Sequence, residues 1–192
     1  LLSSSIEKSQ KVINKFPESK YFDDALFLIG KSSFLKEDYI FSKKYFNQLL
    51  LEFPNGDLDI ETKIWLAYTY LRIEDLDSCM LYIKQINNRI IKINRYNNLL
   101  INTILGEMMI LKDSINLGYD YFEKAINYSN SDVKKSAMYV DLVKIAEDFQ
   151  DIKKAIYFLD KVDQYVRTPE IKFDNKMKWI KYNRDLGNFN LL

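Results

Sequence analysis

Apolar and aromatic residues recur along this chain with the spacing of an α-helix. One face of a predicted helix carries such residues at positions i, i+4, i+7, i+8 and i+11, namely Ile60, Ile64, Ala67, Tyr68 and Leu71. Residues 152–162 repeat this spacing, and short polar segments such as 36–38 and 149–151 separate successive helical patterns. Because a connection of this length makes neighbouring helices pack antiparallel, the pattern predicts an all-α chain built from helical hairpins.

The predicted hairpins repeat with a nearly constant period. Gly30 and Ala67 lie 37 residues apart, as do the turn residues Glu37 and Glu74, and the same skeleton returns after 39 and then 37 residues. A repeat of this kind predicts stacked hairpins, because one hairpin cannot bury its apolar face alone. The predicted organisation is a single domain at 1–192, with full units at 19–56, 57–92, 93–130 and 131–168 and partial units at 1–18 and 169–192.

Two Phe-Pro dipeptides mark the ends of predicted units. Phe16-Pro17 and Phe53-Pro54 lie 37 residues apart, and each follows a predicted second helix. Proline lacks a backbone N–H and has a fixed φ, so it stops a helix that would otherwise continue. We therefore expect each Phe to pack between neighbouring units and each Pro to lie just past a helix end.

Small residues occupy matching places in the predicted helices. We expect two helix backbones to approach closely at these places, because a large side chain would push the helices apart. The residues are Gly30, Ala67 and Gly106 in first helices and Ser42, Cys79, Gly118 and Ala155 in second helices. The cysteine is therefore interpreted as a buried structural thiol rather than a reactive one.

This combination of residues resembles the tetratricopeptide repeat, a helix-turn-helix unit of about 34 residues. The residues that carry the resemblance are the pairs Ile29-Gly30, Leu66-Ala67 and Leu105-Gly106, the large residues Phe34 and Tyr70, the second-helix residues Phe46, Phe122 and Ala155, and the terminal Pro17 and Pro54. The resemblance covers nearly the whole chain. It implies a right-handed α-solenoid of antiparallel helical hairpins.

The period departs from the family pattern. Units of 37 and 39 residues, with Phe-Pro at two of their ends, resemble bacterial envelope proteins of the tetratricopeptide class. Examples are the outer-membrane assembly lipoprotein of the Bam complex and the coordinator partner of the Tol-Pal system. This resemblance favours a periplasmic or envelope-associated location over the cytoplasm. The two extra residues of the longer unit fall within 87–98, where we expect a helix irregularity.

Composition and charge narrow the possible functions. Five Gly and three Pro in 192 residues disfavour turn-rich architectures. The net charge of +1 gives no overall electrostatic footprint for nucleic acid. A local basic patch beside an aromatic residue keeps nucleic-acid binding open; it comprises Arg89, Lys92, Arg95 and Tyr96. The most apolar window, 99–111, is too short and too polar to span a bilayer.

The sequence lacks several residue types and motifs on which catalytic sites commonly depend. The chain has no histidine, which excludes Ser-His-Asp and Cys-His nucleophilic sites, histidine acid–base catalysis and most zinc sites. Its five glycines are isolated from one another, so the sequence has no glycine-rich phosphate loop. We therefore expect no enzyme, no cofactor, no metal and no small-molecule substrate.

The family resemblance implies a concave groove lined by the first helix of each unit. The partner-binding residues carried over to this sequence are Phe27, Lys31, Phe34, Glu61, Ile64, Tyr68, Arg72, Glu107 and Lys144, with Thr103, Ile110, Val140 and Glu147 beside them. Aromatic residues mixed with charges of both signs suit a peptide, with Lys31 and Arg72 pairing with its carboxylates. For the apolar residues, packing in the core is an equally good interpretation.

The leading hypothesis is a non-catalytic scaffold that binds a peptide or partner protein in this groove. The alternative is a structural subunit of a bacterial envelope assembly, such as an outer-membrane assembly, secretion or flagellar machine, held by its edges or ends. Nucleic-acid binding is the third. The chain begins without Met and ends shortly after a turn-like Gly187-Asn188-Phe189. We therefore expect a fragment, with any membrane attachment through an anchor outside it.

Overall fold

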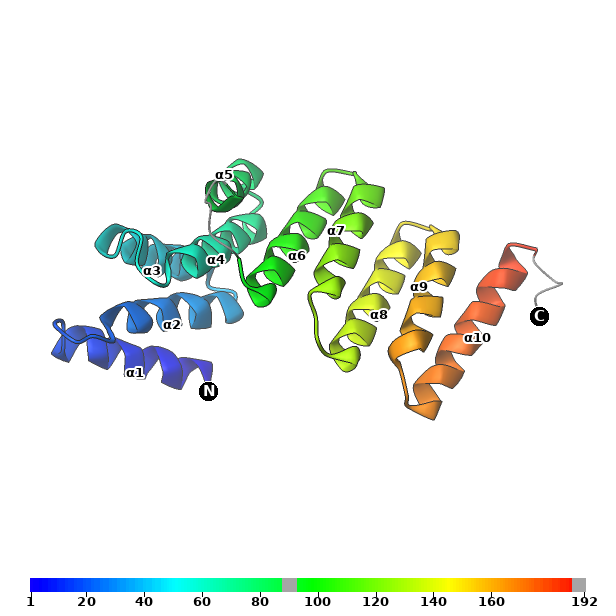
Figure 1. The fold of residues 1–192 in the computed structure, drawn as a ribbon, viewed down its shortest axis with the longest axis horizontal. Helices are drawn as coiled ribbons and strands as arrows, with labels where there is room; N and C mark the ends of the chain where they lie inside the picture. Colours follow the sequence, from blue (N-terminus) through cyan, green and yellow to red (C-terminus); the bar gives the residue numbers. More distant parts are fainter. Residues whose placement is uncertain (88–92, 188–192) are drawn as a thin grey trace.

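The computed structural model describes residues 1–87 and 93–187, and within them all regular secondary structure is helical (Figure 1). These residues form ten α-helices and no β-strand: α1 (Leu2–Lys15), α2 (Phe22–Leu35), α3 (Tyr39–Glu52), α4 (Asp59–Arg72), α5 (Leu76–Asn87), α6 (Arg95–Leu111), α7 (Ile115–Asn127), α8 (Asp132–Asp148), α9 (Ile152–Tyr165) and α10 (Pro169–Asp185). The prediction of an all-α chain is confirmed. None of the described helices combines the length and apolar character needed to cross a membrane.

The helices form hairpins that follow one another in chain order. α2 packs on α3, α4 on α5, α6 on α7 and α8 on α9, while α1 packs on α2 and α10 on α9. Figure 1 shows them arranged in a row, with α1 and α10 toward opposite ends. We call α2, α4, α6, α8 and α10 the first helices. First helices also meet across units, because α4 contacts both α2 and α6.

Each hairpin turn has the same backbone conformation. One residue per turn has a positive φ of 55–63°; the four are Glu37, Glu74, Asp113 and Gln150. The next residue donates its N–H five residues back. Asp38 N–H donates to the Ser33 carbonyl at 3.0 Å, and Asp151 N–H donates to the Ala146 carbonyl at 2.8 Å. The side chains of Asp38, Asp75 and Asp151 also accept from backbone N–H groups in the first turn of the next helix, so these three turns join a helix C-terminus directly to a side-chain N-cap.

Two sequence predictions extend outside the described residues. Of the predicted turn at 187–189, only Gly187 is described, and its φ of 77° continues the series of positive-φ turn residues. Of the segment 87–98, where we expect a helix irregularity, residues 88–92 lie outside the described residues; among the described ones, α5 ends at Asn87 and α6 begins at Arg95.

Helix backbones approach closely at the predicted small residues. A Cβ added to Gly30 would lie 2.7 Å from the Phe46 ring, and one added to Gly106 would lie 2.9 Å from the Phe122 ring. A Cβ on Gly118 would lie 3.2 Å from the Gly106 carbonyl oxygen. The other small residues are fully buried: Ser42, Ala67, Cys79 and Ala155. The predicted close approach is confirmed at Gly30, Gly106 and Gly118, because a Cβ at any of them would press on the neighbouring helix of the α2–α3 or α6–α7 pair.

The two Phe-Pro dipeptides follow helix ends, but their phenylalanines do not pack between units. Pro17 and Pro54 lie two residues past the ends of α1 and α3, as predicted. Phe16 is 62% exposed, and the ring of Phe53 contacts Phe22 of its own hairpin at a centroid distance of 6.2 Å. The packing prediction is wrong because both phenylalanines follow the last helical turn, outside the faces on which the helices pack.

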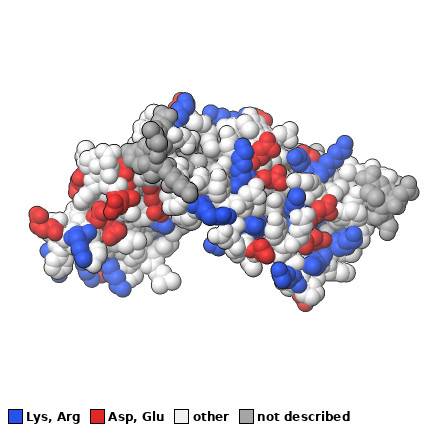
Figure 2. All heavy atoms as spheres, in the orientation of Figure 1, with Lys and Arg blue, Asp and Glu red and all other residues white. Residues whose placement is uncertain are grey.

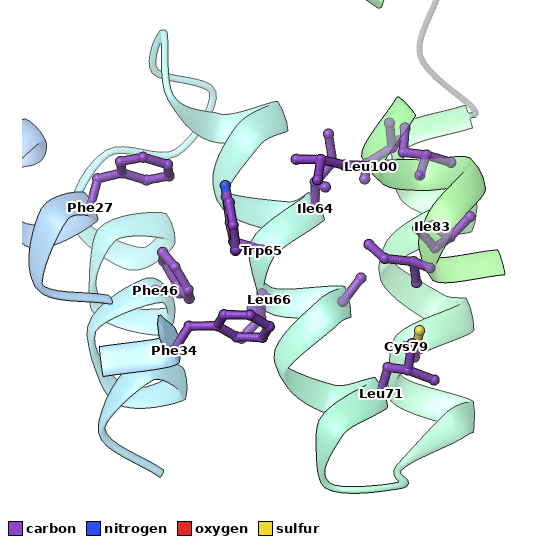
Figure 3. Close-up of a cluster of buried hydrophobic side chains, with 14 of the residues drawn as sticks. Phe27, Phe34, Phe46, Ile64, Trp65, Leu66, Leu71, Cys79, Ile83 and Leu100 are labelled. Carbon is purple, nitrogen blue, oxygen red and sulfur yellow. The ribbon is translucent and has the colours of Figure 1, made fainter. Parts of the chain in front are cut away.

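The buried apolar residues divide into two clusters. One covers residues 26–108 on helices α2–α6, and Figure 3 shows Phe34 and Trp65 facing each other within it. The other covers residues 119–182 on helices α7–α10. Ile110, near the end of α6, packs against this second cluster. The division of the core therefore runs along the hairpin formed by α6 and α7.

Candidate partner-binding surface

Three polar side chains close the junction between α4 and α6. Tyr68 Oη donates to Glu107 Oε1 at 2.7 Å, and Arg72 Nη2 donates to Tyr68 Oη at 2.7 Å. Arg72 Nη2 also lies 2.7 Å from Glu107 Oε2, and its guanidinium carbon lies 4.7 Å from the centroid of the Tyr68 ring. Tyr68 and Glu107 each precede the positive-φ residue of their own turn by six positions. The repeat therefore brings these two side chains to the same level of adjacent helices.

Burial changes the titration of this cluster. It raises the pKa of the Glu107 carboxyl above its usual 4.5, although hydrogen bonding to Tyr68 and Arg72 and the charge of Arg72 act in the opposite direction. Burial, together with the neighbouring carboxylate, also raises the pKa of the Tyr68 phenol. Arg72 was expected to pair with a carboxylate of a partner. The structure shows it already paired with Glu107 of its own chain.

Lys31 of α2 is also enclosed by side chains of its own chain. Its ammonium lies 4.8 Å from the centroid of a Trp65 ring, and the rings of Phe27 and Tyr96 lie at 5.6 and 5.9 Å. Glu61 Oε1 lies 3.8 Å from the same ammonium. A carboxylate and three aromatic rings therefore surround the lysine, so a partner carboxylate would have to compete with Glu61 for it.

The junction between α8 and α10 is closed by the same combination of groups. Glu147 Oε1 accepts from Lys178 Nζ at 2.9 Å and from the Tyr182 hydroxyl. Burial raises the pKa of Glu147, but hydrogen bonds from Tyr182 and Lys178 outweigh burial and hold the pKa below the usual 4.5. A carboxylate, a cation and a tyrosine thus connect the two helices.

The junction between α6 and α8 lacks such a connection and contains a pocket. Both helices lie wholly within the described residues, and no hydrogen bond or ion pair joins their side chains: Glu107 binds α4, and Asp141 pairs within α8. The pocket has a volume of about 450 Å³. It is lined by Arg72, Thr103, Glu107, Ile110, Leu111, Phe122, Met138, Asp141, Leu142 and Ile145. Apolar side chains therefore form most of its wall.

A second hollow of about 500 Å³ lies on the other side of α8, toward the start of α10. Its lining includes Val133, Ala137, Val140, Lys144, Val166 and Ile171. Asp141 lines both hollows. Its side chain is 68% exposed, and Oδ1 lies 3.3 Å from Lys144 Nζ. The two hollows therefore adjoin at Asp141 on the exposed face of α8.

The structure brings together only part of the predicted groove. Arg72, Thr103, Glu107 and Ile110 line the pocket between α6 and α8, and Val140 and Lys144 line the second hollow. Lys31, Glu61, Tyr68 and Glu147 line neither hollow and lie instead in the internal contacts described above.

Three predicted groove residues lie in the core. Phe27 and Phe34 are buried, and Ile64 has no exposed surface. The ring of Phe34 lies 4.9 Å from the ring of Tyr68, centroid to centroid. These apolar side chains are covered because they pack within the buried cluster of helices α2–α6, where α4 contacts both α2 and α6.

Several pocket residues were missed from the sequence. They are Leu111, Phe122, Met138, Asp141, Leu142 and Ile145. Met138, Leu142 and Ile145 have the spacing i, i+4, i+7, which the sequence shows but which is equally typical of a helix face buried in the core. What distinguishes them is that they line the pocket between α6 and α8, and that is a property of the packing.

The basic patch considered for nucleic acid is only partly described. Arg95 donates to the backbone carbonyls of Asn127 and Tyr128 at 3.2 and 3.4 Å, at the C-terminal end of α7, where a cation is favoured by the helix dipole. Arg89 and Lys92 lie outside the described residues. On the face shown in Figure 2, acidic and basic side chains are interspersed.

We next consider the groups among the described residues that could bind a metal ion or act as a nucleophile. Among the residues that the structure describes, no three or more His, Cys, Asp or Glu side chains are grouped to hold a metal ion. Cys79 is fully buried, and burial raises the pKa of its thiol to about 11. The thiol is therefore protonated near neutral pH, as expected for a structural cysteine.

Comparisons of the chain with protein-family models and with curated proteins found no match.

Proposed function

We propose that this chain is a non-catalytic protein–protein interaction scaffold that binds a segment of a partner polypeptide over α6 and α8. The observation that carries the proposal is the apolar pocket between these helices, which adjoins a second hollow at Asp141. In this proposal the hairpins form a right-handed tetratricopeptide-like solenoid whose first helices present the binding surface.

Unfilled apolar surface supports a binding role. Leu111 is 51% exposed at the pocket, and Ile110 and Met138 are half-buried. Contiguous apolar surface bordered by polar groups commonly marks an interaction site. Both hollows fall in the range of about 300–1,000 Å³ that is typical of ligand sites. Their arrangement on either side of α8 suits a chain segment that crosses the helix, with separate side chains entering the two hollows.

The polar groups of the pocket suit a role in binding. Arg72 and Glu107 neutralise each other, and the Thr103 hydroxyl donates to the Leu99 carbonyl at 3.0 Å. Among the described lining residues, no nucleophile lies beside a base that could activate it. Apolar contact area with a few oriented charges is sufficient for recognition of a polypeptide.

Leu111→Glu tests the proposal. A phage-displayed library of random peptides is panned against the purified chain, and the affinity of enriched peptides is measured by fluorescence anisotropy. Burying a leucine side chain contributes about 1.5–3 kcal/mol, so a carboxylate at this position should weaken binding by about tenfold or more.

Leu35→Glu is the matched control. Leu35 ends α2 as Leu111 ends α6, and the two side chains are 53% and 51% exposed, but Leu35 lines neither hollow. The affinity of the selected peptides for this variant should be unchanged. Failure to enrich any peptide, or equal losses in both variants, would contradict the proposal.

A second candidate function is a structural subunit of a bacterial envelope assembly that is held by its ends. It is supported by Phe173 and Met177, two largely exposed apolar residues that are four positions apart on α10. Phe173→Cys coupled to a photo-crosslinker should then capture a neighbouring subunit in native cells, with or without Leu111→Glu. Capture that requires an intact Leu111, or no capture at all, would argue against assembly through this end.

A further inference from the structure

We propose that the bound segment carries a lysine or arginine between two large apolar residues. One apolar side chain occupies the pocket between α6 and α8, the basic side chain pairs with Asp141, and the second apolar side chain occupies the hollow toward α10. This inference rests on the proposed function and names the chemistry of its partner.

The charged side chains of the α6–α8 pocket favour a basic residue in the partner. Three charged residues line it: Arg72, Glu107 and Asp141. The guanidinium of Arg72 lies 2.7 Å from Glu107, and the Tyr68 hydroxyl bridges the same two groups. Because this pair is neutral overall, the pocket presents the negative charge of Asp141.

The carboxylate of Asp141 is available to a cation from a partner. Its partner among the described residues is Lys144 at 3.3 Å, three positions along α8, and the two side chains are 68% and 64% exposed. Exposed pairs of this kind contribute little to stability, because water screens them and both side chains lose rotational freedom. A cation from a partner can therefore replace Lys144 at small cost, and Lys144 is then released to solvent.

An acidic residue is disfavoured in the pocket between α6 and α8. Its carboxylate would meet Arg72, whose guanidinium is engaged by Glu107 and by the Tyr68 hydroxyl. Displacing Glu107 would leave a partly buried carboxylate without its cation, which is costly. The position of Asp141 between the two hollows places a basic residue in the middle of the segment, with apolar residues on both sides.

Peptide panning and a double-mutant cycle between Asp141 and the basic residue of the peptide test the inference. Peptides enriched on the wild-type chain should carry Lys or Arg flanked by large apolar residues. For one such synthetic peptide, Asp141→Asn should weaken binding about fivefold, the effect expected for loss of one exposed ion pair. Replacing the basic residue of the peptide by Gln should weaken binding to the wild type by a similar factor and should cause no further loss with Asp141→Asn.

Asp120→Asn on α7 is the control, because it makes the same charge change at an exposed position that lines neither hollow. Affinity for this variant should match the wild type. Enriched peptides that depend on Leu111 but are acidic or neutral, or that bind Asp141→Asn as tightly as wild type, would overturn this inference and leave the scaffold proposal standing. If panning enriches no peptide, both proposals fail.

Discussion

The junction between α4 and α6 and the junction between α6 and α8 involve equivalent helices but differ in how they are filled. The first is closed by Tyr68, Arg72 and Glu107. The second has no polar connection between the side chains of its two described helices and holds a pocket of about 450 Å³. Repeats with the same helix positions therefore do not produce the same surface.

The difference depends on which side chain occupies one repeated position. Tyr68, Glu107 and Lys144 occupy the same position in three consecutive units, each six residues before a positive-φ turn residue. Glu107 binds Tyr68 and Arg72 on α4, whereas Lys144 lines the hollow on the other side of α8 and pairs with Asp141. Because one carboxylate closes one junction, the next remains open and its apolar wall is available to a partner.

The largest expected effect comes from breaking the hairpin that both junctions share. Gly106→Leu would drive a side chain into the Phe122 ring, which already lies 2.9 Å from an added Cβ, and should destabilise the fold by about 1–3 kcal/mol through overpacking. Urea unfolding measures the loss. Asn116→Leu, which adds an apolar side chain at an exposed position of α7, should change stability by less than about 0.5 kcal/mol. An unchanged unfolding midpoint for Gly106→Leu would refute the close approach of α6 and α7.

Glu107→Ala should open the closed junction. It removes the acceptor of both the Tyr68 hydroxyl and the Arg72 guanidinium and should cost about 1–2 kcal/mol, because both donors lose their partner in a partly buried place. Asp141→Ala, the corresponding loss of a carboxylate at the open junction, should change stability by less than about 0.5 kcal/mol. Thermal unfolding of both variants compares the junctions directly, and equal effects would show that they do not differ energetically.

Tyr68→Phe removes only the bridging hydroxyl of the closed junction. The Glu107 carboxylate loses one hydrogen bond, and the expected cost is about 0.5–1.5 kcal/mol. Tyr96→Phe is the control, because Tyr96 is an exposed tyrosine at the start of α6. Urea unfolding should separate the two variants. If Tyr96→Phe lost as much stability as Tyr68→Phe, the hydrogen bond between Tyr68 and Glu107 would contribute nothing to stability.

The smallest expected effect is a difference in pH dependence between the two closed junctions. The raised pKa of Glu107 means that the folded chain binds its proton more tightly than the unfolded chain, so stability falls as pH rises above about 4.5. The lowered pKa of Glu147 has the opposite sign, so its contribution is lost as pH falls below about 4.5.

Unfolding free energies measured from pH 3.5 to 7 should therefore separate the two carboxylates. Glu107→Gln should reduce the decline in stability above the usual glutamate pKa, whereas Glu147→Gln should reduce the loss of stability below it. The same pH profile in both variants would show that the two carboxylates do not titrate in opposite directions.

Much of the fold follows from local sequence. The apolar period of each segment predicts its helices, and the polar turns at Glu37 and Glu74 mark the hairpins because their geometry depends on adjacent residues alone. Gly106 marks a close helix contact because few other reasons favour glycine inside a helix. The packing of Phe16 could not be predicted in this way, since its exposure depends on what lies beyond the end of α1.

The candidate site follows from the sequence only in part. Repeat position selected Glu107 and Arg72, which line the pocket, and it equally selected Ile64, which is fully buried. Equivalent positions in a repeat share a direction on their helix, whereas their exposure depends on how closely the next unit packs. No pattern in the sequence singled out Asp141 as a binding residue, because its importance comes from the two hollows that meet beside it.

By itself, the sequence determined the helices, the hairpins, the positions of the turns and the glycines where backbones meet, because each depends on residues close together in the chain. Only the tertiary structure decided which junction is closed and which is open. The physical reason is that the Glu107 carboxylate lies 2.7 Å from both Tyr68 and Arg72 on α4, whereas no side-chain hydrogen bond or ion pair joins the described helices α6 and α8, beside which the pocket is exposed.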